Sequence, residues 1–294
     1  MNLLVDPPLE VVVRRWYGER ARDLPWRRPG TSAWAVLVSE FMLQQTPVAR
    51  VEPVYEAWLR RWPTPAALAD EPAGEAVREW GRLGYPRRAL RLHAAAVAID
   101  TLHGGAVPSA LPDLLALPGV GAYTARAVAA FAHRQRHAVL DTNVRRVLAR
   151  CLSGRADAPA SVTAAEWALA ESVLPGPAEE AATYSVAIME LGALVCTARA
   201  PRCTECPLAS RCAWQAAGRP PPDGPARRPQ SYAGTDRQVR GRLLAVLREA
   251  EGPVPPEALT AVWADDVQRE RSLAGLLEDG LVERAGGSFS LPGL

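Results

Sequence analysis

A Gly-Val-Gly turn between two helical patterns constrains the fold of this 294-residue chain more than any other stretch. Residues 113–117 predict a short apolar helix, and the alanine-rich residues 122–133 predict a second helix. The turn formed by Gly119, Val120 and Gly121 should be too tight for side chains at both glycines. Such a hairpin leaves unpaired N–H groups at the start of the second helix, where a phosphate oxygen can bind. The alternative is a helical hairpin without a ligand.

The rest of the first 215 residues predicts helices and no sheet. No stretch between residues 51 and 101 alternates between apolar and polar positions as a half-buried strand does. A capping pair, Thr31-Ser32, precedes a strongly apolar segment. The helices that we expect from apolar periodicity cover residues 9–20, 33–45, 89–99 and 142–152.

Glu40 is the only ionisable residue in the helix expected over residues 33–45. Burial there would raise its pKa, because an unpaired carboxylate is costly away from water. Two interpretations stay open. Glu40 is either a rim or partner-satisfied carboxylate, or a carboxylic acid kept protonated near neutral pH so that it can donate a proton.

Asp141 directly precedes the helix expected over residues 142–152. As an N-cap it would satisfy orphan N–H groups, which is its structural role. The same hydrogen bonds and the positive end of the helix dipole should keep the carboxylate ionised and lower its pKa. The pKa of Glu40 would then be raised and that of Asp141 lowered. Cleavage of a glycosidic bond needs this combination of one protonated acid and one charged carboxylate.

Four of the five cysteines lie close together with the spacing C-x6-C-x2-C-x5-C. A structural zinc site usually has two close cysteine pairs, whereas this segment has one pair with wider gaps on both sides. Disulfides are unexpected in a cytosolic chain. An iron–sulfur cluster is the favoured interpretation, with zinc as the alternative. The expected ligands are Cys196, Cys203, Cys206 and Cys212.

Arginine is the only basic side chain besides histidine, because the sequence contains no lysine. The net charge is only +2, so affinity for nucleic acid must come from local clustering of arginines. Six arginines against two acids lie between residues 196 and 228, and Arg199 and Arg202 are the expected phosphate contacts. Long apolar runs and a signal peptide are missing, so we expect a cytoplasmic, nucleoid-associated protein without membrane contact.

Leu-Pro-Gly-Val-Gly followed by Leu-Asp-Thr-Asn-Val resembles the helix-hairpin-helix superfamily of DNA glycosylases, over about residues 10–215. The cysteine spacing is similar to the [4Fe–4S] loop of the branch that includes endonuclease III and the adenine glycosylases. This resemblance implies a mainly α fold with a [4Fe–4S] cofactor. It implies an iron–sulfur cluster domain over residues 1–30 and 137–218, and a helical barrel domain over residues 31–136.

Within that superfamily, several motifs resemble the MutY-type adenine DNA glycosylases. The run at residues 38–46 is similar to their V-S-E-x-M-L-Q-Q-T signature, which implies that Glu40 is the catalytic acid. It also implies that Gln45 probes the base stack and that Gln44 is a further DNA-binding residue. Tyr85, in a Gly-Tyr pair, matches their intercalating aromatic, and a structural lid is the alternative. An L-P-W-R element implies that Arg27, joined by Arg22, lines the adenine pocket.

The resemblance also implies the course of the reaction. Asp141 matches the second catalytic carboxylate, with Asn143 beside it. Tyr123 stands where relatives that also cut the DNA backbone carry a Schiff-base lysine, so we expect a monofunctional glycosylase. Its partner is double-stranded DNA containing adenine opposite 8-oxoguanine or guanine, bound by a monomer. The alternatives are a mismatch thymine or pyrimidine glycosylase of the same fold and a non-catalytic iron–sulfur DNA-binding protein.

The C-terminal part departs from the family pattern. A proline-rich linker is expected over residues 219–234. Residues 235–294 are too few for the Nudix-like domain that many members carry to read 8-oxoguanine. They instead predict three helices and a hairpin turning at Gly286-Gly287, a winged-helix-like α+β module. This module could bind DNA or contact a protein partner.

Overall fold

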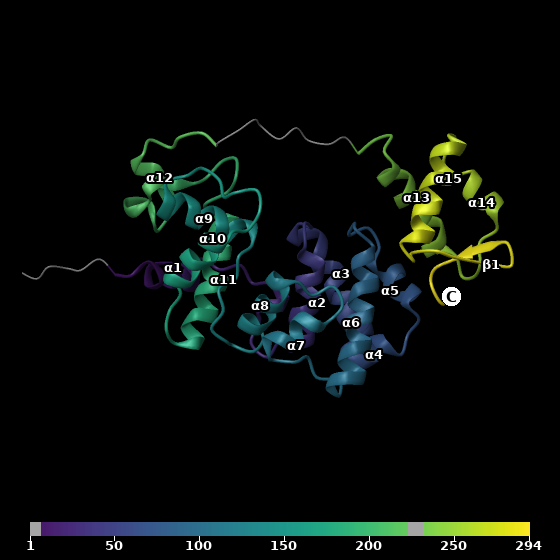
Figure 1. Cartoon of the computed structure of the whole chain (residues 1–294), viewed down its shortest axis with the longest axis horizontal. Coiled ribbons are helices and arrows are strands. Elements are labelled where there is room, and N and C mark those ends of the chain that lie inside the picture. The colour runs from purple at the N-terminus through teal and green to yellow at the C-terminus, as the bar shows by residue number, and fades with distance from the viewer. Residues whose placement is uncertain (1–6, 223–231) are drawn as a thin grey trace, which may run out of the picture. The chain divides into compact units, whose positions relative to one another are not determined.

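The computed structural model describes residues 7–222 and 232–294 and is mainly helical in both stretches (Figure 1). The predicted mainly α fold with a small C-terminal α+β module is confirmed. The elements up to the hairpin region are α1 (Leu9–Arg20), η1 (Pro25–Arg27), α2 (Ala33–Leu43), α3 (Val48–Arg61), α4 (Pro65–Ala69), α5 (Ala73–Trp80), α6 (Arg87–His103), α7 (Leu111–Ala116) and α8 (Ala122–Phe131). Those that follow are α9 (Thr142–Ser153), α10 (Ala164–Ser172), α11 (Ala178–Leu194), η2 (Cys203–Glu205), η3 (Ala209–Arg211), α12 (Ala213–Ala216), α13 (Asp236–Glu249), α14 (Pro256–Thr260), α15 (Asp266–Glu278), β1 (Glu283–Ala285) and β2 (Ser288–Ser290).

The first of two structural units combines segments that are far apart in sequence. Within the described residues it comprises 7–36, 109–115 and 120–222. Its helices α1 and α9 both pack against α11. The apolar face of α9 is buried here as its periodicity predicts. The residues of that face are Val144, Val147, Leu148 and Cys151.

The second unit comprises residues 37–108, 116–119 and the described C-terminal residues 232–294. Its core contains three fully buried tryptophans: Trp58 on α3, Trp62 at the end of α3 and Trp80 on α5. Trp58 meets Trp62 and Trp80 edge to face, with ring centroids 4.6 and 5.7 Å apart. This cluster anchors α5 against α3, and the turn that follows α5 starts from a rigid base.

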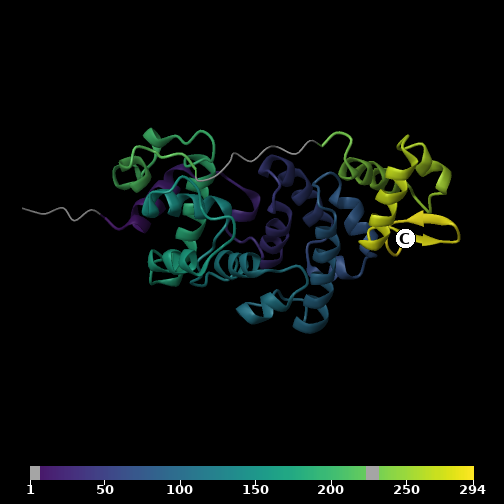
Figure 2. The same ribbon diagram turned by 45° about the horizontal axis from the view of Figure 1, so that its top comes forward.

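The C-terminal residues contain the three helices and the hairpin that the sequence predicts. Helix α13 packs against α14 and α15, and β1 pairs with β2 in an antiparallel hairpin that turns at Gly286 and Gly287. Val254 adds a bridge to Phe289 of β2, which ties the loop before α14 to the hairpin. Figure 2 shows the hairpin as two arrows beside the module's helices. The predicted linker, 219–234, lies largely outside the described residues.

Two sequence expectations about backbone geometry need correction. Helix α2 ends at Leu43 and does not reach residue 45, because Gln45 adopts a left-handed conformation with φ of 56°. Only one glycine of the 119–121 turn is constrained. Gly119 has φ of 77°, and a Cβ there would lie 2.7 Å from Arg91 Cβ, whereas Gly121 is extended and has open space around it.

None of the helices in the described part of the chain is long and apolar enough to span a membrane.

Candidate functional site

Asp141 caps helix α9 as its position in the sequence predicts. Its Oδ1 accepts a hydrogen bond of 2.6 Å from the N–H of Val144, and its Oδ2 accepts one of 2.7 Å from Asn143 Nδ2. Both oxygens are therefore held in place by donors on the first turn of the helix. This cap fixes the direction in which the carboxylate points.

The pKa of Asp141 is raised, which contradicts the expectation that the cap would lower it. Burial destabilises the charged form and is the largest effect. The hydrogen bonds from Val144 and Asn143 and the charge of Arg146 act in the opposite direction without cancelling it. A partly desolvated carboxylate of this kind interacts strongly with any positive charge that develops beside it.

A chain of hydrogen bonds connects Asp141 with the segment that begins the cysteine loop. Asn143 Oδ1 accepts a bond of 2.7 Å from Arg146 Nη2, and Arg146 Nε donates 2.6 Å to the carbonyl of Cys196. One turn further along α9, Arg150 donates to the carbonyls of Thr197 and Ala198. Sequence reasoning missed both arginines. The signal was available, because they follow Asn143 by three and seven residues and so lie on one face of α9 with it.

The four predicted cysteine ligands are half-buried around the loop that follows α11. Arg150 Nη1 lies 3.5 Å from Cys196 Sγ, so a positive charge stands beside a sulfur that would be anionic as a ligand. Burial raises the pKa of Cys206 to about 11, so ligation must displace its proton. Four soft thiolates are the usual ligands of an iron–sulfur cluster, and a hydrogen-bond donor such as Arg150 beside a ligand sulfur tunes its reduction potential. The residues present therefore fit the cofactor.

Glu40 lies on α2 with only 5% of its surface exposed, so it is not a rim residue. Past the end of that helix, Gln44 is half-buried and Gln45 is exposed. The left-handed backbone of Gln45 costs about 1 kcal/mol for a residue with a side chain. Such strain persists only where the surroundings impose it.

Arg88 supplies that constraint, and sequence reasoning did not single it out. It is buried, and its Nη1 donates to the carbonyls of Phe41, Met42 and Gln44 at the end of α2. Its Nη2 donates 2.9 Å to the carbonyl of Gly84. Burial lowers its pKa to about 10. One guanidinium thus holds two turns, the one with Gln45 and the one with Tyr85.

Tyr85 occupies the second of these turns, between α5 and α6. Its side chain is 52% exposed and its φ is 48°, another left-handed residue. Trp80 stabilises the turn, because its Nε1 donates a hydrogen bond of 3.0 Å to the carbonyl of Gly84. The ring of Tyr85 is therefore not a core residue, and its insertion into a base stack stays a prediction.

Arg22 and Arg27 hold a carboxylate that the sequence analysis did not identify. Glu190 on α11 is fully buried and accepts from Arg22 Nη2 at 2.7 Å and from Arg27 Nη1 at 2.8 Å. Burial alone would raise the pKa of Glu190, but the hydrogen bonds and charges of the two arginines lower it to about 2. The arginines are therefore positioned by Glu190, and their role in lining a base pocket stays a prediction.

The remaining predicted residues lie in varied surroundings. Tyr123 is half-buried in the first turn of α8 and packs against an apolar cluster that includes Val139. Val120 is buried, so its backbone is the part that could meet a phosphate. Arg199 is exposed, while Arg202 is half exposed, donates to the carbonyl of Leu194 and pairs with Glu205 at 3.3 Å.

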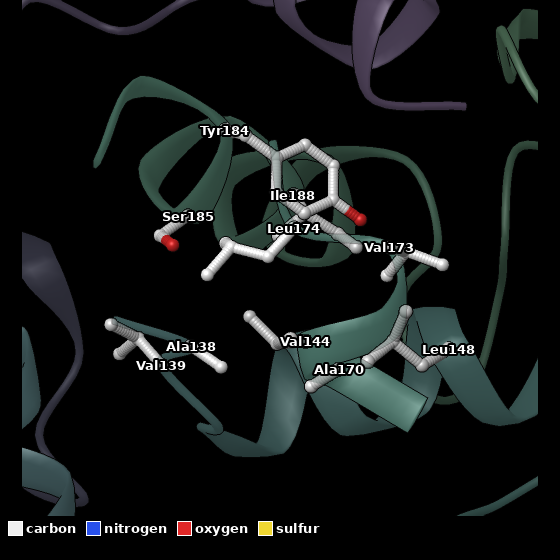
Figure 3. A pocket seen from close by; sticks show the side chains of 10 residues that line it. All are labelled: Ala138, Val139, Val144, Leu148, Ala170, Val173, Leu174, Tyr184, Ser185 and Ile188. Atoms are coloured by element: carbon white, nitrogen blue, oxygen red, sulfur yellow. The ribbon is translucent and has the colours of Figure 1, made fainter. Parts of the chain in front are cut away.

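The first unit contains a pocket that is lined by Val139 and Val144, among other residues. Figure 3 shows its lining, which is apolar except for Tyr184 and Ser185. Ser185 Oγ donates to the carbonyl of His137, and burial raises the pKa of Tyr184. A pocket with so few polar groups offers little to recognise a nucleobase, and we interpret it as a packing gap beside α9 and α11.

Comparison with known families assigns both parts of this arrangement. Residues 38–171 match the HhH-GPD superfamily of base excision DNA repair proteins. Residues 196–212 match the iron–sulfur binding domain of endonuclease III. The second match covers the whole predicted cysteine loop, from its first ligand to its last.

Individual proteins are similar over most of the chain. The adenine DNA glycosylase of Mycobacterium tuberculosis is 58% identical over 280 residues, which cover 95% of this chain and 91% of that protein. The adenine DNA glycosylase of Mycolicibacterium smegmatis is 56% identical over 288 residues, covering 97% and 96%. Among solved structures, a thermostable thymine-DNA glycosylase aligns with a TM-score of 0.63 and 25% identity, over 71% of this chain and 95% of that one.

Proposed function

The chain belongs to the adenine DNA glycosylase family, and on that premise we propose that it removes adenine mispaired with 8-oxoguanine or guanine from double-stranded DNA. It is a base-excision-repair glycosylase with an iron–sulfur loop. The observation that carries the finer proposal is the 58% identity over 280 residues with an adenine DNA glycosylase. That similarity includes the C-terminal module, in which this chain departs from members that carry a Nudix-like domain.

The reaction is a hydrolysis of the N-glycosidic bond with two carboxylates in different roles. Glu40 protonates the flipped adenine and converts a poor leaving group into a good one. Asp141 stabilises the oxocarbenium-like charge on the sugar, by its own charge or by transient covalency. Asn143 keeps Asp141 in place through the 2.7 Å hydrogen bond. Water completes the reaction, and the products are free adenine and an abasic site.

The DNA contacts follow from the backbone donors and exposed side chains already described. Gly119 lets a phosphate approach the turn closely, with Gly121 providing the extended start of α8. Gln45 and Tyr85 present exposed side chains from two strained turns to the opened base stack. We propose that the protein acts as a monomer on the nucleoid.

An excision assay tests this function directly. One labelled duplex set pairs A, T, U or C with G and with 8-oxoguanine. We expect excision of adenine opposite 8-oxoguanine and guanine, and no excision of the pyrimidines. Faster removal of thymine would assign the chain to the activity named for the structurally similar thymine-DNA glycosylase. Binding without any excision would support the non-catalytic alternative.

We expect the purified protein to be brown and to contain about four irons per chain, because one four-cysteine loop binds one [4Fe–4S] cluster. Cys206→Ala should lose most of that iron. Cys151→Ala is the matched control, because Cys151 is a buried core residue of α9 and should not be a ligand. Iron analysis and the absorption spectrum of protein purified without oxygen measure both. Stoichiometric zinc without labile sulfide would contradict the assignment.

We also expect no strand cleavage by the enzyme itself. Tyr123 stands at the position of the lyase lysine, and the sequence contains no lysine that could replace it. Arginine stays protonated and is not a nucleophilic amine. Borohydride added during turnover should leave no protein–DNA crosslink, and product strands should break only after alkali or heat. A crosslink that persists after the N-terminal amine is blocked would place the protein among the bifunctional enzymes.

A further inference from the structure

We propose that the C-terminal module, residues 232–294, acts as a brace that positions the Tyr85 turn for insertion into DNA. This inference rests on the proposed function, because it assumes that Tyr85 enters the base stack. The module contacts both helices that flank the turn: α5, which precedes it, and α6, which follows it. It thereby makes Arg78, Arg248 and Asp279 positioning residues for excision.

The contact with α5 is a reciprocal exchange of arginines between two helix ends. Arg78 Nη1 donates 2.6 Å to the carbonyl of Arg248 and 2.7 Å to that of Ala250, where α13 ends. Arg248 Nε in turn donates 2.9 Å to the carbonyl of Val77 on α5. Orphan carbonyls at a helix C-terminus prefer such cationic donors. Burial lowers the pKa of Arg248 to about 10, as expected for a guanidinium enclosed in a contact.

The N-terminal end of α5 is held by the last residues of the described chain. The N–H of Gly74 donates 2.7 Å to the carbonyl of Pro292. A Cβ at position 74 would lie 2.7 Å from that carbonyl oxygen and 2.9 Å from the side chain of Leu294. Only glycine allows this approach. The module therefore contacts α5 near both of its ends.

The contact with α6 is an ion pair at its first residue. Asp279, which follows α15, lies 3.1 Å from Arg87 Nη1 and also pairs with Arg240 of α13. Arg87 comes two residues after Tyr85 in the sequence. The module thus reaches both segments on which the turn depends.

The turn itself needs such support. Tyr85 is both left-handed and 52% exposed, so neither its backbone preference nor burial of its ring stabilises the observed conformation. Trp80 and Arg88 close the turn from within by their bonds to Gly84. The C-terminal module adds to this by fixing α5 and α6, the two helices that flank the turn.

Charge argues against the module as an independent DNA reader. Residues 235–294 contain seven arginines against ten aspartates and glutamates. Four of the seven arginines, Arg240, Arg248, Arg269 and Arg271, are engaged by ion pairs or carbonyls of this unit. A net negative module is repelled by phosphates, whereas a DNA-binding module concentrates positive charge. The contacts that the structure shows for the module are those with α5 and α6.

The test uses the full-length protein and a duplex that carries 2-aminopurine beside an adenine·8-oxoguanine pair, so that opening of the base stack raises fluorescence. Asp279→Asn should weaken binding about three- to fivefold, the scale of a half-exposed ion pair, and should lower the fluorescence increase. Asp236→Asn is the matched control. Asp236 pairs with Arg271 at 2.7 Å inside the module, so both measurements should stay at wild-type values. Gly74→Ala, compared with Gly18→Ala in open space on α1, tests the second contact.

A double-mutant cycle separates positioning from general destabilisation. In a Tyr85→Ala background, Asp279→Asn should have no further effect on binding or fluorescence. An effect of equal size in both backgrounds would overturn the inference, as would an Asp279→Asn variant indistinguishable from Asp236→Asn. If the wild type opens the stack but excises no adenine, the proposed function fails while the cycle still decides the role of the brace.

Discussion

Asp141→Asn is expected to bind mispaired DNA with wild-type affinity and to excise adenine at least ~100-fold more slowly, because an amide cannot offset the positive charge that forms on the sugar. Asparagine is as good an N-cap as aspartate, so the bond to the Val144 N–H can persist and α9 should stay folded. Single-turnover excision and equilibrium binding, measured on the same duplex, distinguish a lost reaction from a lost complex.

Asp265→Asn is the matched control for this substitution. Asp265 caps α15 by accepting 2.9 Å from the N–H of Gln268, which repeats the local geometry of Asp141 in the C-terminal module. We expect its excision rate to equal that of the wild type. Glu40→Gln should lose excision like Asp141→Asn, because an amide cannot protonate the base. Near wild-type rates for either catalytic variant would mean that the active site has been misplaced.

Glu190→Gln should lower the free energy of unfolding by about 3 kcal/mol at pH 7, the equivalent of a pKa shift from 4.5 to about 2. The variant keeps the shape of the side chain but leaves Arg22 and Arg27 without their counter-charge. Glu179→Gln is the control on the same helix. Its carboxylate is 70% exposed and pairs with Arg134, so the loss should stay below about 1 kcal/mol.

The effect of Glu190 should depend on pH in a definite direction. Its pKa is lower in the folded protein than in the unfolded chain, so the carboxylate stabilises the fold fully above about pH 4.5. That contribution is lost as the pH falls toward 2. The difference between wild type and Glu190→Gln in urea unfolding should therefore be largest at pH 7 and smaller at pH 3 to 4. A constant difference would show that charge is not its source.

Local patterns predicted much of this structure. The spacing of apolar residues was enough for α1 and α9, and the aspartate before α9 does cap it. The turn at Gly286-Gly287 also predicted its hairpin correctly. Each of these features depends on residues that are close in sequence, and their preferred conformations agree with the fold that contains them.

Features that depend on distant residues could not be predicted in this way. Glu190 is the one acid in the apolar second half of α11, but its partners lie 163 and 168 residues away. Arg88 falls on the buried face of α6 one turn before Leu92, yet nothing local shows that its guanidinium binds carbonyls of α2. The raised pKa of Asp141 likewise reflects burial by the whole fold. Docking of the C-terminal module on α5 had no sequence signal.

The length of helix α9 sets the separation between Asp141 and the cysteine loop. Asp141 stands before its first turn, and Arg146 and Arg150 bind the loop carbonyls from its second and third. A helix advances about 1.5 Å and rotates about 100° per residue. One inserted or deleted residue between Asn143 and Arg146 would therefore turn the carboxylate away from the frame set by the loop. A substitution along this helix can shift the Asp141 carboxylate slightly, whereas a change in the helix length reorients it by about 100° per residue.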